Sequence, residues 1–176
     1  GAGNIQIQLA GGASINSTGG AILMGGGASA AANARGQGGS QLGATGIYVD
    51  GNISAGTGSV TMRGQGAAGA GDGIAFEGGT LTSDGTVTIS DTASASAGGS
   101  TFVGGVRFAN AGTRLTTATG NVTITGTNTN GPSNAQGVHV NAATIETTGT
   151  GSLTLNGTSS GQGGNWAVGL ITGGTV

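Results

Sequence analysis

The sequence of 176 residues contains no cysteine and one proline, and only 6% of its residues are charged and 3% aromatic. The absence of cysteine excludes disulfides and thiolate metal sites, and it suits a chain that crosses a membrane unfolded. No apolar run approaches the roughly 20 residues of a membrane-spanning helix. The net charge is −2, lysine is absent and there is no basic patch, so nucleic acid is not expected as a partner.

Glycine, in contrast, is abundant with 43 residues, and alanine, serine, threonine and asparagine fill most of the remainder. So few large side chains cannot build a thick core. Disorder is not the expectation either, because disordered chains usually carry high net charge and much proline. Regularly spaced Val, Ile and Leu among small residues predict a thin core built by repetition.

An internal repeat organises the chain. A glycine followed by an alternating apolar pair recurs in the segments GIYV, GIAF, GVRF, GVHV and GLIT, at Gly46, Gly73, Gly105, Gly137 and Gly169. Each of the first four is followed by a lone apolar residue and then by an apolar-Thr-apolar triplet, at 60–62, 87–89, 122–124 and 153–155. The N-terminal stretch fits the same scheme with Ile5, Ile7, Ile15, Ile22 and Met24. The pattern therefore predicts three short strands in each unit, because the apolar residues alternate with period two. No segment shows the apolar spacing of an amphipathic helix.

The loops between these strands vary in length without disturbing the repeat. Val49 and Ile53 are 4 positions apart, whereas their counterparts Phe108 and Leu115 are 7 apart. Loops that project sideways from a stack tolerate such variation, and tight hairpin turns do not. The sequence therefore predicts an all-β fold, a right-handed single-stranded parallel β-helix with three short strands per coil, about five to six coils and no capping helix.

The whole chain, 1–176, is expected to form one β-helix segment. Its coils would start near residues 4, 46, 73, 105, 137 and 169, and residues 25–45 would form a long low-complexity lateral loop. Stacking the coils predicts five inward columns of apolar side chains. These are Ile47, Ile74, Val106, Val138 and Leu170; Val49, Phe76, Phe108 and Val140; Ile53, Leu81, Leu115 and Ile145; Val60, Val87, Val122 and Leu153; and Met62, Ile89, Ile124 and Leu155.

Charged and titratable side chains that could act in catalysis or metal binding are few: four Arg, four Asp, two Glu and one His. The best candidates are Asp50 and Glu77, which both follow the second inward column and should stack on adjacent coils, about 5 Å apart. That is near the separation of the carboxylates in a retaining glycosidase, and it also suits a cation. The simpler interpretation, that both end their strands at the solvent edge, is the one we favour. We expect no catalytic residue, no metal site and no cofactor.

Other side chains also allow two interpretations. Arg107 and His139 fall on adjacent coils at an outward position, and the lone His139 is expected to be a solvated surface residue. Trp166 and Phe102 each precede a repeat glycine by three residues. Both are expected to pack a lateral loop against the rod, with stacking on a sugar as the alternative.

A column of threonines is expected to face outward, formed by Thr61, Thr88, Thr123 and Thr154. Such a ladder suits a parallel stack, because β-branched residues favour strands and neighbouring hydroxyls pair across them. An ice-binding surface is the functional alternative. The partner column, Arg63, Ser90, Thr125 and Asn156, is not uniform.

Three segments carry a resemblance to a known family: GNVTITGTNTNG (120–131), IETTGTGSLTLNGTSSG (145–161) and LTSDGTVTISDTASASAGG (81–99). They resemble the repeats of filamentous-haemagglutinin-type exoproteins, large bacterial surface proteins secreted by the two-partner route. The resemblance covers most of residues 46–176 and lies in composition and period. It implies a long β-helical shaft outside the cell, and it carries over no functional residue.

The sequence thus predicts a structural or adhesive shaft module of a secreted bacterial surface protein, taken as an excerpt of a longer chain and not an enzyme. Alternatives are a self-stacking subunit of an extracellular filament, a carbohydrate-active β-helix using Asp50 and Glu77, and the ice-binding ladder. Expected partners are neighbouring coils or stacked copies, a host or neighbouring-cell surface, glycans, and an outer-membrane transporter during secretion.

Overall fold

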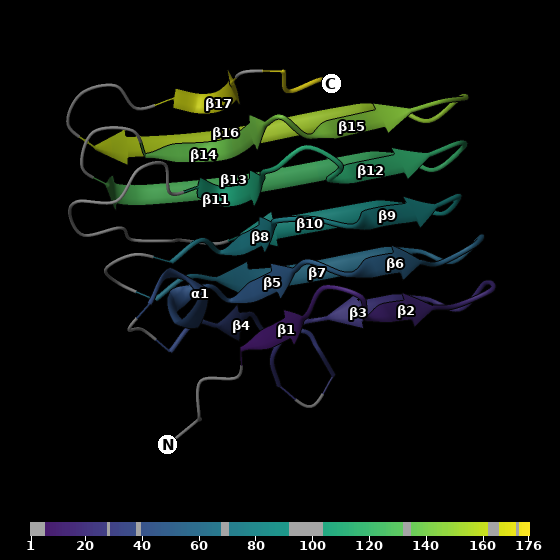
Figure 1. Cartoon of the computed structure of the whole chain (residues 1–176), viewed down its shortest axis with the longest axis horizontal. Coiled ribbons are helices and arrows are strands. Elements are labelled where there is room, and N and C mark those ends of the chain that lie inside the picture. Colours follow the sequence, from purple (N-terminus) through teal and green to yellow (C-terminus); the bar gives the residue numbers. More distant parts are fainter. Residues whose placement is uncertain are drawn as a thin grey trace.

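A computed structural model describes residues 6–27, 29–37, 40–67, 71–91, 104–131, 135–161, 166–171 and 173–176. The chain winds into successive coils whose strands form three parallel sheets, and the result is a β-solenoid (Figure 1). Within the described residues, the paired strands of the three sheets run parallel and come from successive coils, which is the all-β stacked architecture that the repeat predicts.

Each sheet collects one strand from each coil. Sheet A contains, in spatial order, β1 (Ile7–Leu9), β5 (Ile47–Val49), β8 (Ile74–Phe76), β11 (Gly104–Phe108), β14 (Gln136–Asn141) and β17 (Trp166–Ile171). Sheet B contains β2 (Ser14–Asn16), β6 (Asn52–Ser54), β9 (Thr80–Ser83), β12 (Arg114–Thr117) and β15 (Thr144–Thr147). Sheet C contains β3 (Ile22–Met24), β7 (Val60–Gln65), β10 (Val87–Asp91), β13 (Val122–Gly131) and β16 (Leu153–Gly161).

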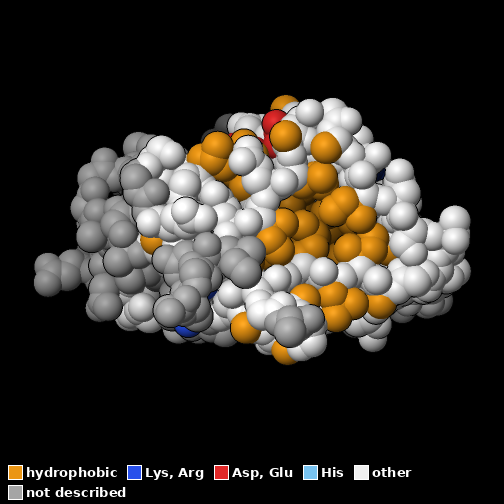
Figure 2. Space-filling view, turned by 90° about the horizontal axis from the view of Figure 1, so that it is seen from below, with side chains coloured by type: hydrophobic (Ala, Val, Ile, Leu, Met, Phe, Trp, Pro, Cys, Tyr) orange, Lys and Arg blue, Asp and Glu red, His pale blue; other side chains and the backbone are white. Residues whose placement is uncertain are grey.

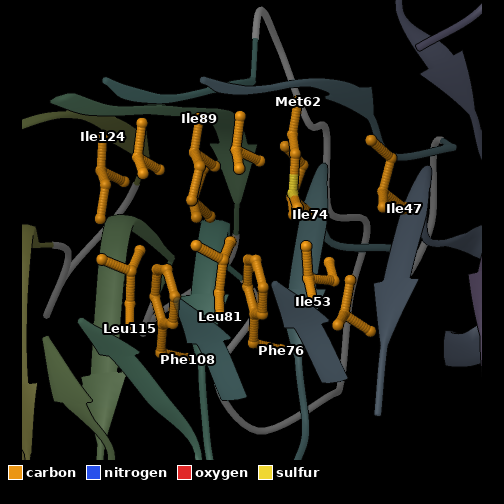
Figure 3. Close-up of a cluster of buried hydrophobic side chains, with 14 of the residues drawn as sticks. Ile47, Ile53, Met62, Ile74, Phe76, Leu81, Ile89, Phe108, Leu115 and Ile124 are labelled. Carbon is orange, nitrogen blue, oxygen red and sulfur yellow. The ribbon is translucent and has the colours of Figure 1, made fainter. Parts of the chain in front are cut away.

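The core fills the space between the three sheets. Side chains from sheets B and C face each other across it, with Ile124, Ile89 and Met62 opposite Leu115, Leu81 and Ile53 (Figure 3). The rings of Phe76 and Phe108 stack with centroids 4.5 Å apart. The second to fifth predicted columns pair in register. Burial of these columns, at about 1.5–3 kcal/mol for each large side chain, is the main stabilising term.

The first predicted column is wrong at its C-terminal member. Val138 pairs with Val168, so Leu170 pairs with Val140 in the second column, where its side chain is 55% exposed. The glycine that precedes the apolar pair is replaced in this coil by Ala167, and Gly169 pairs with His139. A shift of two residues keeps every side chain on its face of the sheet, so alternation alone could not detect it.

The N-terminal coil shows the same two-residue error. Ile7 pairs with Ile47 and Leu9 with Val49, whereas the sequence scheme began this coil near residue 4. Ile5 lies outside the described residues. Ile15, Ile22 and Met24 take the predicted places opposite Ile53, Val60 and Met62.

The predicted lateral loop, 25–45, contains local structure in its described residues. A strand, β4 (Ala34–Arg35), pairs with β7, and one helical turn, α1 (Gln41–Ala44), follows it. The Ser40 hydroxyl caps this turn by accepting a hydrogen bond from the Gly43 amide. Backbone bonds from Ala67 to Ala44 and from Gly36 to Gln65 hold the segment against the rod.

Three coils require glycine where sheet C turns toward the next strand of sheet A. An added Cβ at Gly126 would lie 2.0 Å from the carbonyl oxygen of Gly137, and one at Gly157 would lie 1.6 Å from that of Ala167. Gly64 occupies the same position in an earlier coil, paired with Asp91. The two backbones meet so closely here that a side chain has no space.

The end of the solenoid formed by β1, β2 and β3 exposes part of the core. Hydrophobic side chains gather near the middle of this face when it is seen from below (Figure 2). Ile7, Ala13 and Ile15 are only partly buried there, as are Leu153, Leu155 and Val168 in the last coil.

Candidate functional site: a polar cluster on the outer face of sheet A

The outward positions of sheet A bring together several of the few polar side chains of the chain. Tyr48, Ala75, Arg107 and His139 stand in one column across β5, β8, β11 and β14. Arg107 is 8% exposed and His139 2% exposed, so the expectation that His139 is a solvated surface residue is wrong. Alternation distinguishes inward from outward positions, but it does not report whether an outward face is covered.

Arg107 lies at the centre of an ion network. Its Nε donates to Asp72 Oδ2 at 2.8 Å, and its Nη2 forms an ion pair with Glu77 Oε1. The amide of Gly104 donates to Asp72 Oδ1 at 2.7 Å. Asn110 Nδ2 donates to Glu77 Oε2 at 2.9 Å and to the Glu77 carbonyl at 2.7 Å. The network thereby joins two successive coils outside the hydrophobic core.

Burial and charge shift the pKa values of this cluster in different directions. Burial raises the pKa of the Asp72 carboxyl, although Arg107 and the Gly104 amide oppose that shift. Burial opposes the charge on Arg107, but Asp72 and Glu77 outweigh it and raise the pKa of the guanidinium. Burial, followed by the charge of Arg107, lowers the pKa of His139 to about 4. His139 is therefore neutral at physiological pH while Arg107 remains charged.

A pocket of about 310 Å³ opens beside this network. It is lined by Ser40, Leu42, Thr45, Tyr48, Glu77 and Arg107. Burial, then Glu77 and Asp50, raise the pKa of the Tyr48 phenol, so its hydroxyl stays protonated and can donate or accept a hydrogen bond. The pocket therefore combines an aromatic ring, a carboxylate, a guanidinium and hydroxyls.

The two predicted carboxylates do end neighbouring strands, since Asp50 follows β5 and Glu77 follows β8. Their side chains have different surroundings. The Glu77 carboxylate contacts Arg107 and Asn110. The Asp50 carboxylate lies beside the turns at Gly11 and Gly78, where an added Cβ would come within 2.8 and 2.2 Å of its oxygens. Glu77 thus belongs to the ion network.

Trp166, the other predicted surface candidate, is the first residue of β17 and pairs with Gln136. Its side chain is 47% exposed. It stands on the outer coil of sheet A and not beside the pocket. Phe102, its predicted counterpart, lies outside the described residues.

The threonine ladder is present on sheet C. Thr61, Thr88, Thr123 and Thr154 pair in register, and the column continues to Leu23 in the first coil. The neighbouring column contains Arg63, Ser90, Thr125 and Asn156. The hydroxyl surface is therefore interrupted by an apolar side chain at one end and by a cation beside it.

A second hollow, of about 270 Å³, follows the outer edge of sheet B. Its lining is made of small side chains with one carboxylate: Ser54, Gly56, Thr82, Ser83, Asp84, Thr116, Ala118 and Thr148. It contains no aromatic side chain and no cation, so it offers less varied chemistry than the pocket on sheet A.

Within the described parts of the chain, no three His, Asp or Glu side chains are grouped as a metal site would require. Among those same residues, no helix has the length and hydrophobicity to span a membrane. Fold and site together define the chain as a parallel β-solenoid with a buried ion network and an adjoining polar pocket. Comparison with models of protein families, with curated proteins and with solved structures finds no match.

Sequence reasoning missed Asp72 and Asn110 as members of the cluster. Asp72 immediately precedes the repeat glycine Gly73, and Asn110 follows β11 in a left-handed conformation with φ 72°. A signal was available for Asp72, because a lone arginine inside a strand of apolar residues needs a counter-charge if its face is covered. That signal does not say which of the four aspartates supplies it.

Proposed function

We propose that the chain is a shaft module of a large secreted bacterial surface protein, where it acts as a rigid spacer and contact surface. The observation that carries the proposal is the register of the strands: successive coils pair in all three sheets around one continuous core. Each coil adds about 4.8 Å of reach, so the six strands of sheet A span roughly 24 Å. The proposed role is mechanical and does not include catalysis.

The surface chemistry supports this role. Outward positions of sheets B and C carry mainly Thr, Ser and Asn, which suit strands and remain hydrated. The resemblance of residues 81–99, 120–131 and 145–161 to filamentous-haemagglutinin-type repeats agrees with this composition and supports an extracellular location reached by two-partner secretion.

The end faces support stacking on further coils. The face formed by β1, β2 and β3 presents hydrophobic side chains and unpaired strand edges (Figure 2). Such surfaces are covered in stable solenoids, because open edges and open core lead to aggregation. Neighbouring β-helix coils or a stacked copy of this chain are the partners proposed for this face.

An antibody raised against this chain tests the proposal on source cells. We expect immunogold label outside the outer membrane and a denatured band far above 16.2 kDa. Extracellular filaments with a denatured band near 16.2 kDa would replace the shaft by a self-stacking subunit. Label confined to the cytoplasm would contradict both roles.

A further inference from the structure

The pocket beside α1 has walls that are fixed before any ligand arrives. Gln6 Nε2 donates to the carbonyl oxygens of Leu42 and Thr45, the latter at 3.0 Å. Ala67 donates to the Ala44 carbonyl at 2.7 Å. These bonds hold the α1 segment from both sides, so the pocket does not depend on closure around a ligand.

The opposite wall is equally constrained. Arg107 is held by Asp72 and Glu77, and Glu77 is held in turn by Asn110. Side chains locked in this way lose little conformational entropy on binding. Such pre-organisation is what a small polar ligand requires, because it offers few contacts to offset the cost of ordering a site.

The lining combines apolar and polar groups within one small volume. Leu42 and the Tyr48 ring supply apolar surface, whereas Ser40, Thr45, Glu77 and Arg107 supply donors and acceptors. At about 310 Å³ the pocket lies at the lower end of the range for small-molecule sites. A saccharide ring matches this pattern, since it carries hydroxyls around its rim and C–H groups on its faces.

The charge of the site restricts the class of ligand further. Asp72 and Glu77 contribute two carboxylates and Arg107 one guanidinium, so the network has an excess of negative charge. Asp50 adds a further carboxylate close enough to act on Tyr48. An acidic sugar or a phosphate would meet this field unfavourably, whereas a neutral or amino-bearing sugar would not.

We propose that the pocket lined by Ser40, Leu42, Thr45, Tyr48, Glu77 and Arg107 binds a neutral or amino-bearing saccharide unit of a glycan. The inference rests on the proposed function for its biological setting, where it supplies the contact of an adhesive shaft. Binding itself is measured on the isolated chain. Failure of binding would therefore leave the shaft proposal standing, and an intracellular location would leave the pocket chemistry standing.

Tyr48 provides a direct readout because it is the only tyrosine in the chain. Incorporating 3-fluorotyrosine gives one ¹⁹F resonance, which is followed during titration with glucose, galactose, N-acetylglucosamine, glucosamine and sialic acid. We expect a saturable shift with at least one of the neutral or amino sugars and none with sialic acid. No saturable shift with any of them, or a shift with sialic acid alone, would overturn the proposal.

Two variants place the binding in the pocket. Tyr48→Ala removes the ring, and Glu77→Gln removes a charged acceptor without changing its shape. Calorimetry with the best sugar should show each variant about tenfold weaker, the equivalent of one well-formed contact. Thr154→Ala, on the exposed ladder of sheet C, should bind as the wild type does. Undiminished binding by Glu77→Gln, the variant that preserves packing, would contradict the assignment even if Tyr48→Ala failed to fold.

Discussion

At the scale of single residues, a few buried polar groups have a large effect on stability. Asp72 is fully buried, and Arg107 is nearly so, outside the hydrophobic core. A buried ion pair contributes little net stability compared with an apolar replacement. Removing one partner is costly, however, because the other charge is left buried and uncompensated. The Arg107–Asp72 pair is therefore expected to be intolerant of single substitutions and tolerant of paired ones.

Replacing Arg107 by Met should lower the free energy of unfolding by about 3–5 kcal/mol, because the buried Asp72 carboxyl loses its counter-charge and must either stay ionised or take up a proton. Urea unfolding followed by circular dichroism measures the change. Adding Asp72→Asn should restore a large part of the loss, since a neutral amide needs no counter-charge. A double variant as unstable as the sum of the two singles would show that the charges are not coupled.

His139 should make stability depend on pH. Its pKa is lowered to about 4, from 6.5, mainly by burial. Between these values the unfolded chain binds a proton that the folded chain does not, so the free energy of unfolding should fall as the pH is lowered through this window. The loss at this residue is at most about 3 kcal/mol.

His139→Gln provides the control for this effect. Unfolding curves measured at about pH 7 and pH 4.5 should converge more closely in the variant than in the wild type. The raised pKa of Asp72 acts in the opposite sense, but it is present in both proteins and cancels in the comparison. An identical pH dependence in the two proteins would contradict the assignment of the effect to His139.

At the scale of elements, strand identity and strand position were determined by different features. Alternation identified the three strands of each coil, and unequal loops indicated stacking. The two end coils were placed two residues away from their true positions, because β1 and β17 have apolar side chains at every second position and a two-residue shift leaves them facing the core. The hydrogen-bonded partner strand selects between these positions.

The glycine corner between sheets C and A makes a sharp prediction at this scale. Gly126→Ala should lower the free energy of unfolding by several kcal/mol, because its Cβ would lie 2.0 Å from the Gly137 carbonyl oxygen and backbone on both sides would have to move. Thermal unfolding measures the loss.

Gly19→Ala is the matched control for this substitution. Its Cβ would meet only the Thr57 hydroxyl oxygen, at 3.1 Å, and that side chain can rotate. We expect a change within about 1 kcal/mol. Replacing glycine by alanine lowers the conformational entropy of the unfolded chain and by itself favours folding. Equal losses in the two alanine variants would therefore contradict the close approach at Gly126 as their cause.

At the scale of the whole molecule, stability should vary along the rod. Each coil contacts only its neighbours, so inner coils have two stacking interfaces and outer coils one. The side chains of the inner columns are fully buried at Ile74, Leu81 and Ile89, whereas Ile7, Ile15 and Leu155 are only partly buried.

Amide hydrogen exchange should therefore be slowest in β8, β10 and β11 and faster in β1, β2 and β17. Mass spectrometry of exchanged peptides resolves these strands. Uniform protection along the chain would indicate that the solenoid opens as a single cooperative unit, and protection highest at an end would indicate that this end is covered in solution.

The sequence by itself determined that the chain stacks three-stranded coils, because the repeated alternation and the unequal loop lengths suit stacked coils and not tight hairpins. Only the tertiary structure decided that Arg107 and His139 are buried, that Asp72 rather than another aspartate pairs with Arg107, and that Tyr48 borders a pocket. The physical reason is the difference between local patterns and contacts of segments far apart in the sequence. Periodicity is a local property that fixes which face a side chain takes, whereas covering that face requires segments of the chain, such as α1, whose position no local pattern specifies.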